Sequence, residues 1–229
     1  GSEMCIRDRL GSEAYGVIAL SVAMSSIITI VLDFGLILSA TERVVKLAGN
    51  AASLARLLGN VACAKACLAL AVGMVIVVLI LFVPPFSEYR SLFLLYYLAY
   101  AVNAFLPDFF YRGHEDMRII TVRTVMVKVI SALPIFFLLR GPSDMWVVPA
   151  LLLAGNAAAV FFSYCDIRKR YRVEALTFDV KESFGILRAS FGFFVSRFSS
   201  VFYQSMNSVL LGFCLLYTSP SPRDPKTSR

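Results

Sequence analysis

The chain has 229 residues, of which 59% are hydrophobic and 16% charged, with a formal net charge of +7. Its mean hydropathy is +0.75. A soluble domain usually carries about 25% charged residues, so this composition cannot cover a water-soluble core with polar surface. The basic residues fall mostly in short segments between apolar runs, which indicates membrane topology. We expect no nucleic-acid partner, because the sequence holds no groove-reading motif or basic aromatic module.

The two ends of the chain differ from its middle. Residues 1–9 read GSEMCIRDR, and residues 215–229 are rich in Ser, Pro and charge. Both stretches resemble translated sequencing-adapter read-through. We therefore expect 1–9 to be a non-native leader and 215–229 a non-native tail, which leaves 10–214 as a transmembrane helical domain, truncated at both ends.

Several apolar segments are long enough to cross a bilayer, which takes about 20 apolar residues. Lipid offers no hydrogen-bond partner to an exposed backbone, so spanning segments must be helices or closed barrels. Barrel strands are about ten residues long and alternate polar with apolar, unlike these runs. The sequence predicts an all-α fold, a polytopic transmembrane helical bundle with about six spans, at residues 15–40, 61–83, 91–111, 119–139, 145–164 and 183–214.

The loops between the predicted spans carry unequal charge. Loops 41–60, 112–118 and 165–182 together contain ten Lys or Arg residues, whereas loops 84–90 and 140–144 contain two. Lys and Arg stay on the cytoplasmic side of spanning helices. The first three loops are therefore predicted to be cytoplasmic, and the start of the first span is predicted to lie outside.

Two cations lie deep in predicted spans. Lys128 is about 14 Å from the cytoplasmic end of its span, and Arg197 lies about 13–21 Å into the last one. Charges at such depth are costly and mark functional candidates. Both could line a cavity between the helices and contact an anion there. The alternative for each is an internal ion pair or a bond to helix carbonyls.

Other charged residues lie closer to the cytoplasmic interface. Asp33 could bind a coupling ion or pair with a base, or it could make a structural hydrogen bond near the helix end. Arg43 and Arg123 could attract anionic headgroups, although ordinary topology signals explain them equally well. Arg112 could alter substrate contacts or pair with Asp108.

The sequence holds no catalytic constellation. No nucleophile is paired with a histidine, no Gly-rich phosphate loop appears, and the five cysteines lack the partners that a metal site needs. We therefore predict that the chain is not an enzyme, has no metal or other cofactor, and draws energy from ion or substrate gradients.

Five short motifs follow one another along the chain: LGSEAYG at 10–16, DFG at 33–35, LSATER at 38–43, PDFFYRG at 107–113 and FVSRF at 194–198. Together they resemble the O-antigen and polysaccharide flippases of the Wzx type. These belong to the multidrug/oligosaccharidyl-lipid/polysaccharide exporter superfamily. The resemblance covers essentially all of residues 10–214. One departure is Phe109-Phe-Tyr-Arg-Gly113, where that family often has Trp-x-Phe-Gln-Gly.

The resemblance implies that the six spans are the second to seventh of a larger protein, roughly the first half of a two-bundle exporter fold. It implies translocation of an undecaprenyl-pyrophosphate-linked oligosaccharide across the bacterial inner membrane, for O-antigen and lipopolysaccharide synthesis. The implied partners are this lipid-linked oligosaccharide, membrane lipids, a glycan polymerase and chain-length regulator proteins. Arg197, Lys128, Arg123 and Arg43 become candidate substrate-binding residues, and Asp33 and Asp108 candidate ion-coupling or structural residues.

Two other functions stay open at this point. An ion-coupled multidrug or cation exporter of the same superfamily would favour acidic cavity residues; Lys128 and Arg197 argue against it, and Asp33 favours it. A non-transporting membrane scaffold or a membrane-embedded glycan polymerase is the third alternative. A polymerase usually has a large soluble loop, and the longest predicted loop here has about twenty residues.

Overall fold

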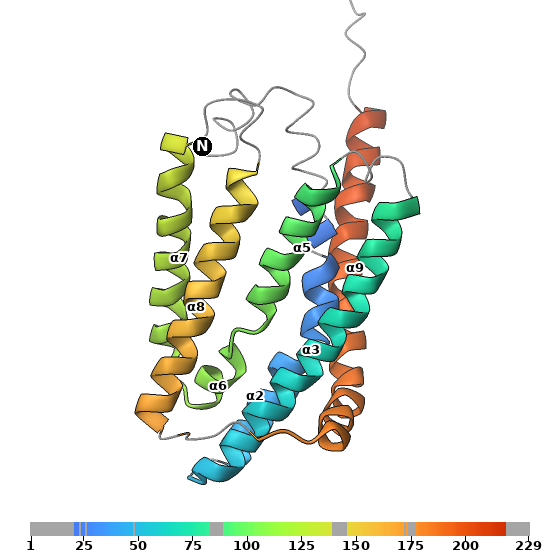
Figure 1. Cartoon of the computed structure of the whole chain (residues 1–229). Helices are drawn as coiled ribbons and strands as arrows, with labels where there is room; N and C mark the ends of the chain where they lie inside the picture. The colour runs from blue at the N-terminus through green and yellow to red at the C-terminus, as the bar shows by residue number, and fades with distance from the viewer. Residues whose placement is uncertain are drawn as a thin grey trace, which may run out of the picture.

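The computed structural model describes residues 21–22, 24–25, 27–47, 49–82, 89–138, 146–171, 173 and 177–218. All regular secondary structure in these ranges is helical, which confirms the all-α prediction. Helical residues between 21 and 33 come first. They are followed by α2 (Leu36–Lys46), α3 (Ala51–Phe82), α5 (Arg90–Ala104), α6 (Asp108–Gly113), α7 (Met117–Leu138), α8 (Val147–Tyr171) and α9 (Val180–Thr218) (Figure 1).

Three stretches of the described chain are long and apolar enough to cross a bilayer: Ala51–Phe82, Arg90–Gly113 and Val147–Tyr171. The second of them takes α5 and α6 together. Large apolar side chains also lie exposed on these helices, for example Leu70, Phe82 and Phe161, each more than 58% exposed. Such a surface suits lipid and not water, and the chain is a membrane protein.

The helices depart from the predicted spans near the first basic loop. Residues 41–60 are mostly helical, because α2 continues to Lys46 and α3 begins at Ala51. The reason is amphipathicity: Leu54, Leu58 and Val61 are buried while Arg56 is exposed. The charged residues of this segment predict a loop, but its apolar residues recur at helical spacing and form one buried face.

Two predicted spans are interrupted. The span predicted at 91–111 breaks between α5 and α6, where Pro107 has no backbone N–H to continue the helix. The span predicted at 15–40 breaks at Phe34 and Gly35, which have φ values of 38° and 69°. The leader at 1–9 lies outside the described residues. Of the tail at 215–229, residues 215–218 belong to α9 and the others are also outside.

The helices form an antiparallel bundle (Figure 1). The most extensive packing is between α5 and α8, with α7 on the other side of α8, while α9 packs against α2 and α3. The junctions α2–α3, α6–α7 and α8–α9 lie at the lower end in Figure 1. These junctions fall in the three basic loops, so nine described Lys or Arg residues gather near one end of the bundle. We call this the basic end.

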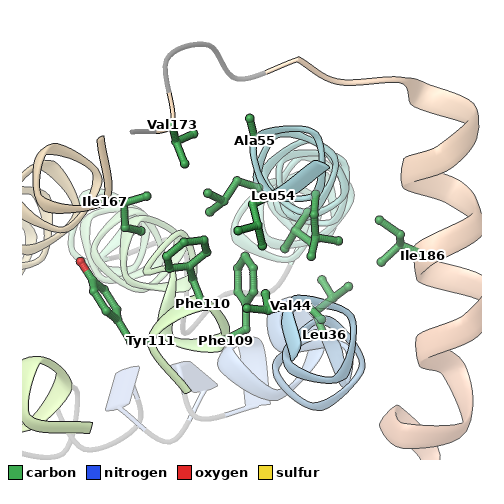
Figure 2. Close-up of a cluster of buried hydrophobic side chains, with 14 residues drawn as sticks. Leu36, Val44, Leu54, Ala55, Phe109, Phe110, Tyr111, Ile167, Val173 and Ile186 are labelled. Atoms are coloured by element: carbon green, nitrogen blue, oxygen red, sulfur yellow. The ribbon is translucent and has the colours of Figure 1, made fainter. Parts of the chain in front are cut away.

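The core near the basic end is built around α6. Phe109, Phe110 and Tyr111 are each at most 2% exposed and belong to one cluster with residues of α2, α3, α8 and α9 (Figure 2). The Phe110 ring packs edge-on against Tyr171, with centroids 4.9 Å apart. Aromatic rings bury large apolar areas, so this short helix is fixed firmly between the longer ones. It holds the neighbouring Asp108 and Arg112 in defined places.

Candidate functional site

The break before α2 is a close crossing with α9. A Cβ atom on Gly35 would lie 2.7 Å from the backbone nitrogen of Phe194, so only glycine fits there. The Phe34 ring stacks on Phe194, with centroids 4.6 Å apart and planes 14° apart. The motifs at 33–35 and 194–198 therefore meet in space. Their residues shape the helix crossing on which Asp33 lies.

Asp33 is half-buried immediately before this crossing. The positive charges of Lys65 on α3 and Arg197 on α9 both act on its carboxylate. A carboxylate at membrane depth is stabilised by such neighbours. The structure thus brings together two residues that the sequence had singled out separately, Asp33 and Arg197, and adds Lys65.

Lys65 was missed as a candidate by sequence reasoning. It is only 3% exposed, its Nζ donates a hydrogen bond to the Ala104 carbonyl, and it lies 5.9 Å from the Phe109 ring centroid. Ala104 ends α5, where the last carbonyls lose their helical partners. Lys65 satisfies one of them. The available signal was a lysine inside the apolar run 61–83.

Asp108 and Arg123 form an ion pair between α6 and α7. The Arg123 side chain is 10% exposed, and its second nitrogen donates to Ser163 Oγ on α8 at 3.1 Å. The suggested pairing of Asp108 with Arg112 is wrong, because α6 points Arg112 outward, where it is exposed. Arg123 instead links three helices.

Tyr111 extends this network. Its hydroxyl lies 3.0 Å from the Ser163 carbonyl oxygen and 3.1 Å from Asp166 Oδ2. Asp166 also lies 3.6 Å from Arg170 Nε, one turn along α8. The polar groups of this network, on α6, α7 and α8, are thus largely occupied by one another. They hold these helices together more than they present free charge.

A groove of about 650 Å³ lies at the basic end between α2, α3 and α9. We call it the basic groove, because Arg43, Lys46 and Arg56 line it. Lys46 pairs with Glu42 at 2.6 Å. In the part of the chain that the structure describes, Arg43 and Arg56 make no ion pair.

One acidic residue, Glu182, also lines the basic groove. The Asn60 amide, 3% exposed, donates to Glu182 Oε2 at 2.6 Å. Asn60 also accepts from the backbone N–H of Asp179 at 2.7 Å. Asn60 therefore links α3 to the start of α9, and its amide occupies one carboxylate oxygen of Glu182. With two unpaired arginines, the groove is suited to an anion.

Lys128 stands apart from these contacts. Its side chain is exposed on α7, next to the exposed Val125 and Val129. Arg197 is also exposed, but its charge acts on Asp33. Of the predicted substrate-binding residues, Arg43 lines the basic groove, Arg123 is held in the ion pair, and Arg197 acts on Asp33 only through its charge. A role for Lys128 in binding stays a prediction.

Comparison with known proteins agrees with the motifs. The family described as polysaccharide biosynthesis protein matches residues 8–217. No curated protein and no solved structure matches the chain. The family match includes all five motifs and all the described helices except the last residue of α9, Thr218. The chain therefore belongs to the polysaccharide biosynthesis protein family, the family of Wzx-type polysaccharide flippases and related exporters.

Proposed function

We propose that this chain translocates a lipid-linked oligosaccharide, with an undecaprenyl-pyrophosphate carrier, across the bacterial cytoplasmic membrane for O-antigen synthesis. The observation that carries the proposal is the basic groove, where Arg43 and Arg56 lack acidic partners among the described residues. A pyrophosphate is the anionic part of such a carrier. The groove would receive it from the cytoplasmic leaflet.

The chemistry of the groove suits a phosphate ester. Arginine offers a planar fork of N–H donors that can bind two phosphate oxygens at once. The volume of about 650 Å³ lies within the range of small-molecule sites. The apolar carrier tail would remain in lipid, since the groove lies at the rim of the bundle and does not need to enclose it.

Arg197 is a further cation on α9, the helix that contributes Glu182 to the basic groove. Arg197 is fifteen residues after Glu182 on α9, which corresponds to about 22 Å along the helix. We infer that the anionic headgroup passes from the basic groove toward Arg197. The charges of Arg197 and Lys65 act on Asp33. An anion bound to Arg197 would offset the charge of that arginine and so change the electrostatic environment of the Asp33 carboxylate. This is the basis for its proposed role in ion coupling.

The direct test removes the two groove charges without changing side-chain length much. Arg43→Gln and Arg56→Gln, singly and together, would be expressed in a bacterium that lacks its own flippase. Surface polysaccharide would be quantified at matched levels of membrane-inserted protein. We expect each single change to reduce export severalfold and the double change to abolish it.

The matched control is Lys169→Gln, an exposed cation on α8 at the same end but outside the groove. It removes the same charge and should leave export near the wild-type level. Equal export by the double groove variant and the wild type would rule out the groove as the headgroup site. An equal loss in Lys169→Gln would show that net charge, and not the groove, matters.

A further inference from the structure

A second groove lies on the opposite side of the bundle from α9, between α7 and α8 (Figure 1). Its volume is about 670 Å³. Most of its lining is apolar, with Val122, Met126 and Ile130 of α7 exposed along one wall. Small residues of α8, including Ala154 and Ala158, form the floor. We call it the α7–α8 groove.

The groove has the length of one membrane leaflet. Its lining on α7 runs from Arg118 to Ile130, which is about 18 Å along the helix. Half of a hydrocarbon core about 30 Å thick is about 15 Å. Because α8 is apolar enough to span and α7 packs along it, the groove lies at bilayer depth. One acyl chain of a lipid in the adjacent leaflet would fit along it.

The charged groups of the groove gather at one end, the basic end. Arg123 is neutralised by Asp108, and Asp166 lies next to Arg170 and the Tyr111 hydroxyl.

Arg118 is different from these groups. It is exposed in the first turn of α7 and makes no ion pair within the described ranges. The groove thus ends at one uncompensated cation, placed at the depth where a lipid phosphate would lie.

We propose that the α7–α8 groove binds an anionic phospholipid, with one acyl chain along Val122 to Ile130 and the phosphate on Arg118. Basic pockets between membrane helices recognise anionic headgroups in this way. The site is separate from the basic groove of α2, α3 and α9 and does not depend on the transported substrate. A phospholipid here would fill the space that the small α8 residues leave open beside α7.

The experiment measures which lipids the purified protein retains. The protein is extracted from membranes, exchanged into micelles that contain equal phosphatidylglycerol and phosphatidylcholine, and analysed by native mass spectrometry. We expect phosphatidylglycerol to be retained preferentially. Arg118→Gln should lower the ratio of retained phosphatidylglycerol to phosphatidylcholine about fivefold, the effect of losing one cation near a membrane surface. Lys169→Gln, at the same end but outside the groove, should leave the ratio unchanged.

A second pair of variants tests the apolar part. Ala158→Trp places an indole in the groove and should reduce retention of both lipids. Ala157→Trp adds the same side chain at the neighbouring exposed position, which does not line the groove, and should not. Equal retention of the two lipids by the wild type would overturn the proposal. So would stronger retention of added undecaprenyl phosphate than of phosphatidylglycerol, or equal effects of the two tryptophans.

Discussion

The carboxylate of Asp108 and the guanidinium of Arg123 pair across the junction of α6 and α7, with the arginine side chain only 10% exposed. Ser163 on α8 accepts a second hydrogen bond from Arg123. The pair therefore joins three helices at the point where the chain turns. In this state Arg123 is not available to a headgroup, although its position near the basic end agrees with the sequence prediction.

Removing one partner of this pair should destabilise the protein by about 3 kcal/mol, because the other charge is left unpaired in a poorly solvated place. Asp108→Ala and Arg123→Ala would each lower the midpoint of thermal unfolding in detergent. The double variant should lose less than the sum of the single losses, since it leaves no unpaired charge. Additive effects in the double-mutant cycle would contradict a pair that acts as one structural unit.

Lys65 should matter for stability through the end of α5. Lys65→Met keeps the length and apolar stem but leaves the Ala104 carbonyl without its side-chain donor. An unpaired buried carbonyl costs about 1–3 kcal/mol. Lys128→Met is the matched control, because that lysine is exposed. Thermal unfolding compares the two, and a change for Lys65→Met no greater than that of the control would disprove the capping role.

The helix crossing at Gly35 should not tolerate a methyl group. Gly35→Ala puts a Cβ 2.7 Å from the Phe194 nitrogen and requires a left-handed backbone, which by itself costs about 1–3 kcal/mol. The added Cβ of Gly113→Ala would clash with Val44 Cγ1 and push α6 away from α2. We expect both variants to accumulate poorly and to unfold at lower temperature.

The control for these glycines is Gly192→Ala. Nothing lies within 4 Å of its Cβ position, and it belongs to α9. Alanine is the better helix former by about 1 kcal/mol, so this variant should be as stable as the wild type or more so. Destabilisation by Gly192→Ala as large as that by Gly35→Ala would show that the close crossing is not the cause.

Arg197→Ala should reduce polysaccharide export while the protein still inserts, because it removes the deep cation that acts on Asp33. Lys128→Ala tests the other deep cation in the same assay, and we expect export to fall there too. Arg197→Lys keeps the charge and should retain part of the activity. Normal surface polysaccharide in both alanine variants would exclude these residues from the transport path.

Labelling the two ends of α8 would show which end of the bundle faces the cytoplasm. In a background where the native cysteines are replaced by serine, Trp146→Cys and Lys169→Cys place one thiol at each end of α8, both at exposed positions. A membrane-impermeant maleimide applied to intact cells should label Trp146→Cys only. The basic end would then face the cytoplasm. Labelling of Lys169→Cys in sealed cells would reverse the proposed orientation.

Much of the fold followed from local patterns. Runs of apolar residues predicted helices such as α3 and α8, and both are long and apolar enough to span. The clustering of Lys and Arg in alternate loops predicted that these loops share one end, as Figure 1 shows. The basic residues of 41–60 predict a loop, but residues 51–60 are helical, because the buried Leu54, Leu58 and Val61 recur at helical spacing.

The site was less predictable. Asp33 and Arg197 stood out because a charge in an apolar run is visible in sequence, but their proximity depends on how α2 crosses α9. The partner in an ion pair depends on the tertiary structure. Three arginines, at positions 112, 118 and 123, lie within fifteen positions after Asp108, and the path of α6 into α7 selects Arg123.

The sequence by itself determined that this protein is helical, that it is a membrane protein and that alternate loops carry an excess of cations. These properties follow from sequence because hydropathy and charge are sums over local residues. The tertiary structure alone decided which of those cations remain unpaired. Arg123 forms an ion pair with Asp108. In contrast, Arg43, Arg56 and Arg118 line grooves and form no ion pair with the described acidic residues. The physical reason is that an ion pair needs its two groups within about 4 Å, and helix packing sets that distance.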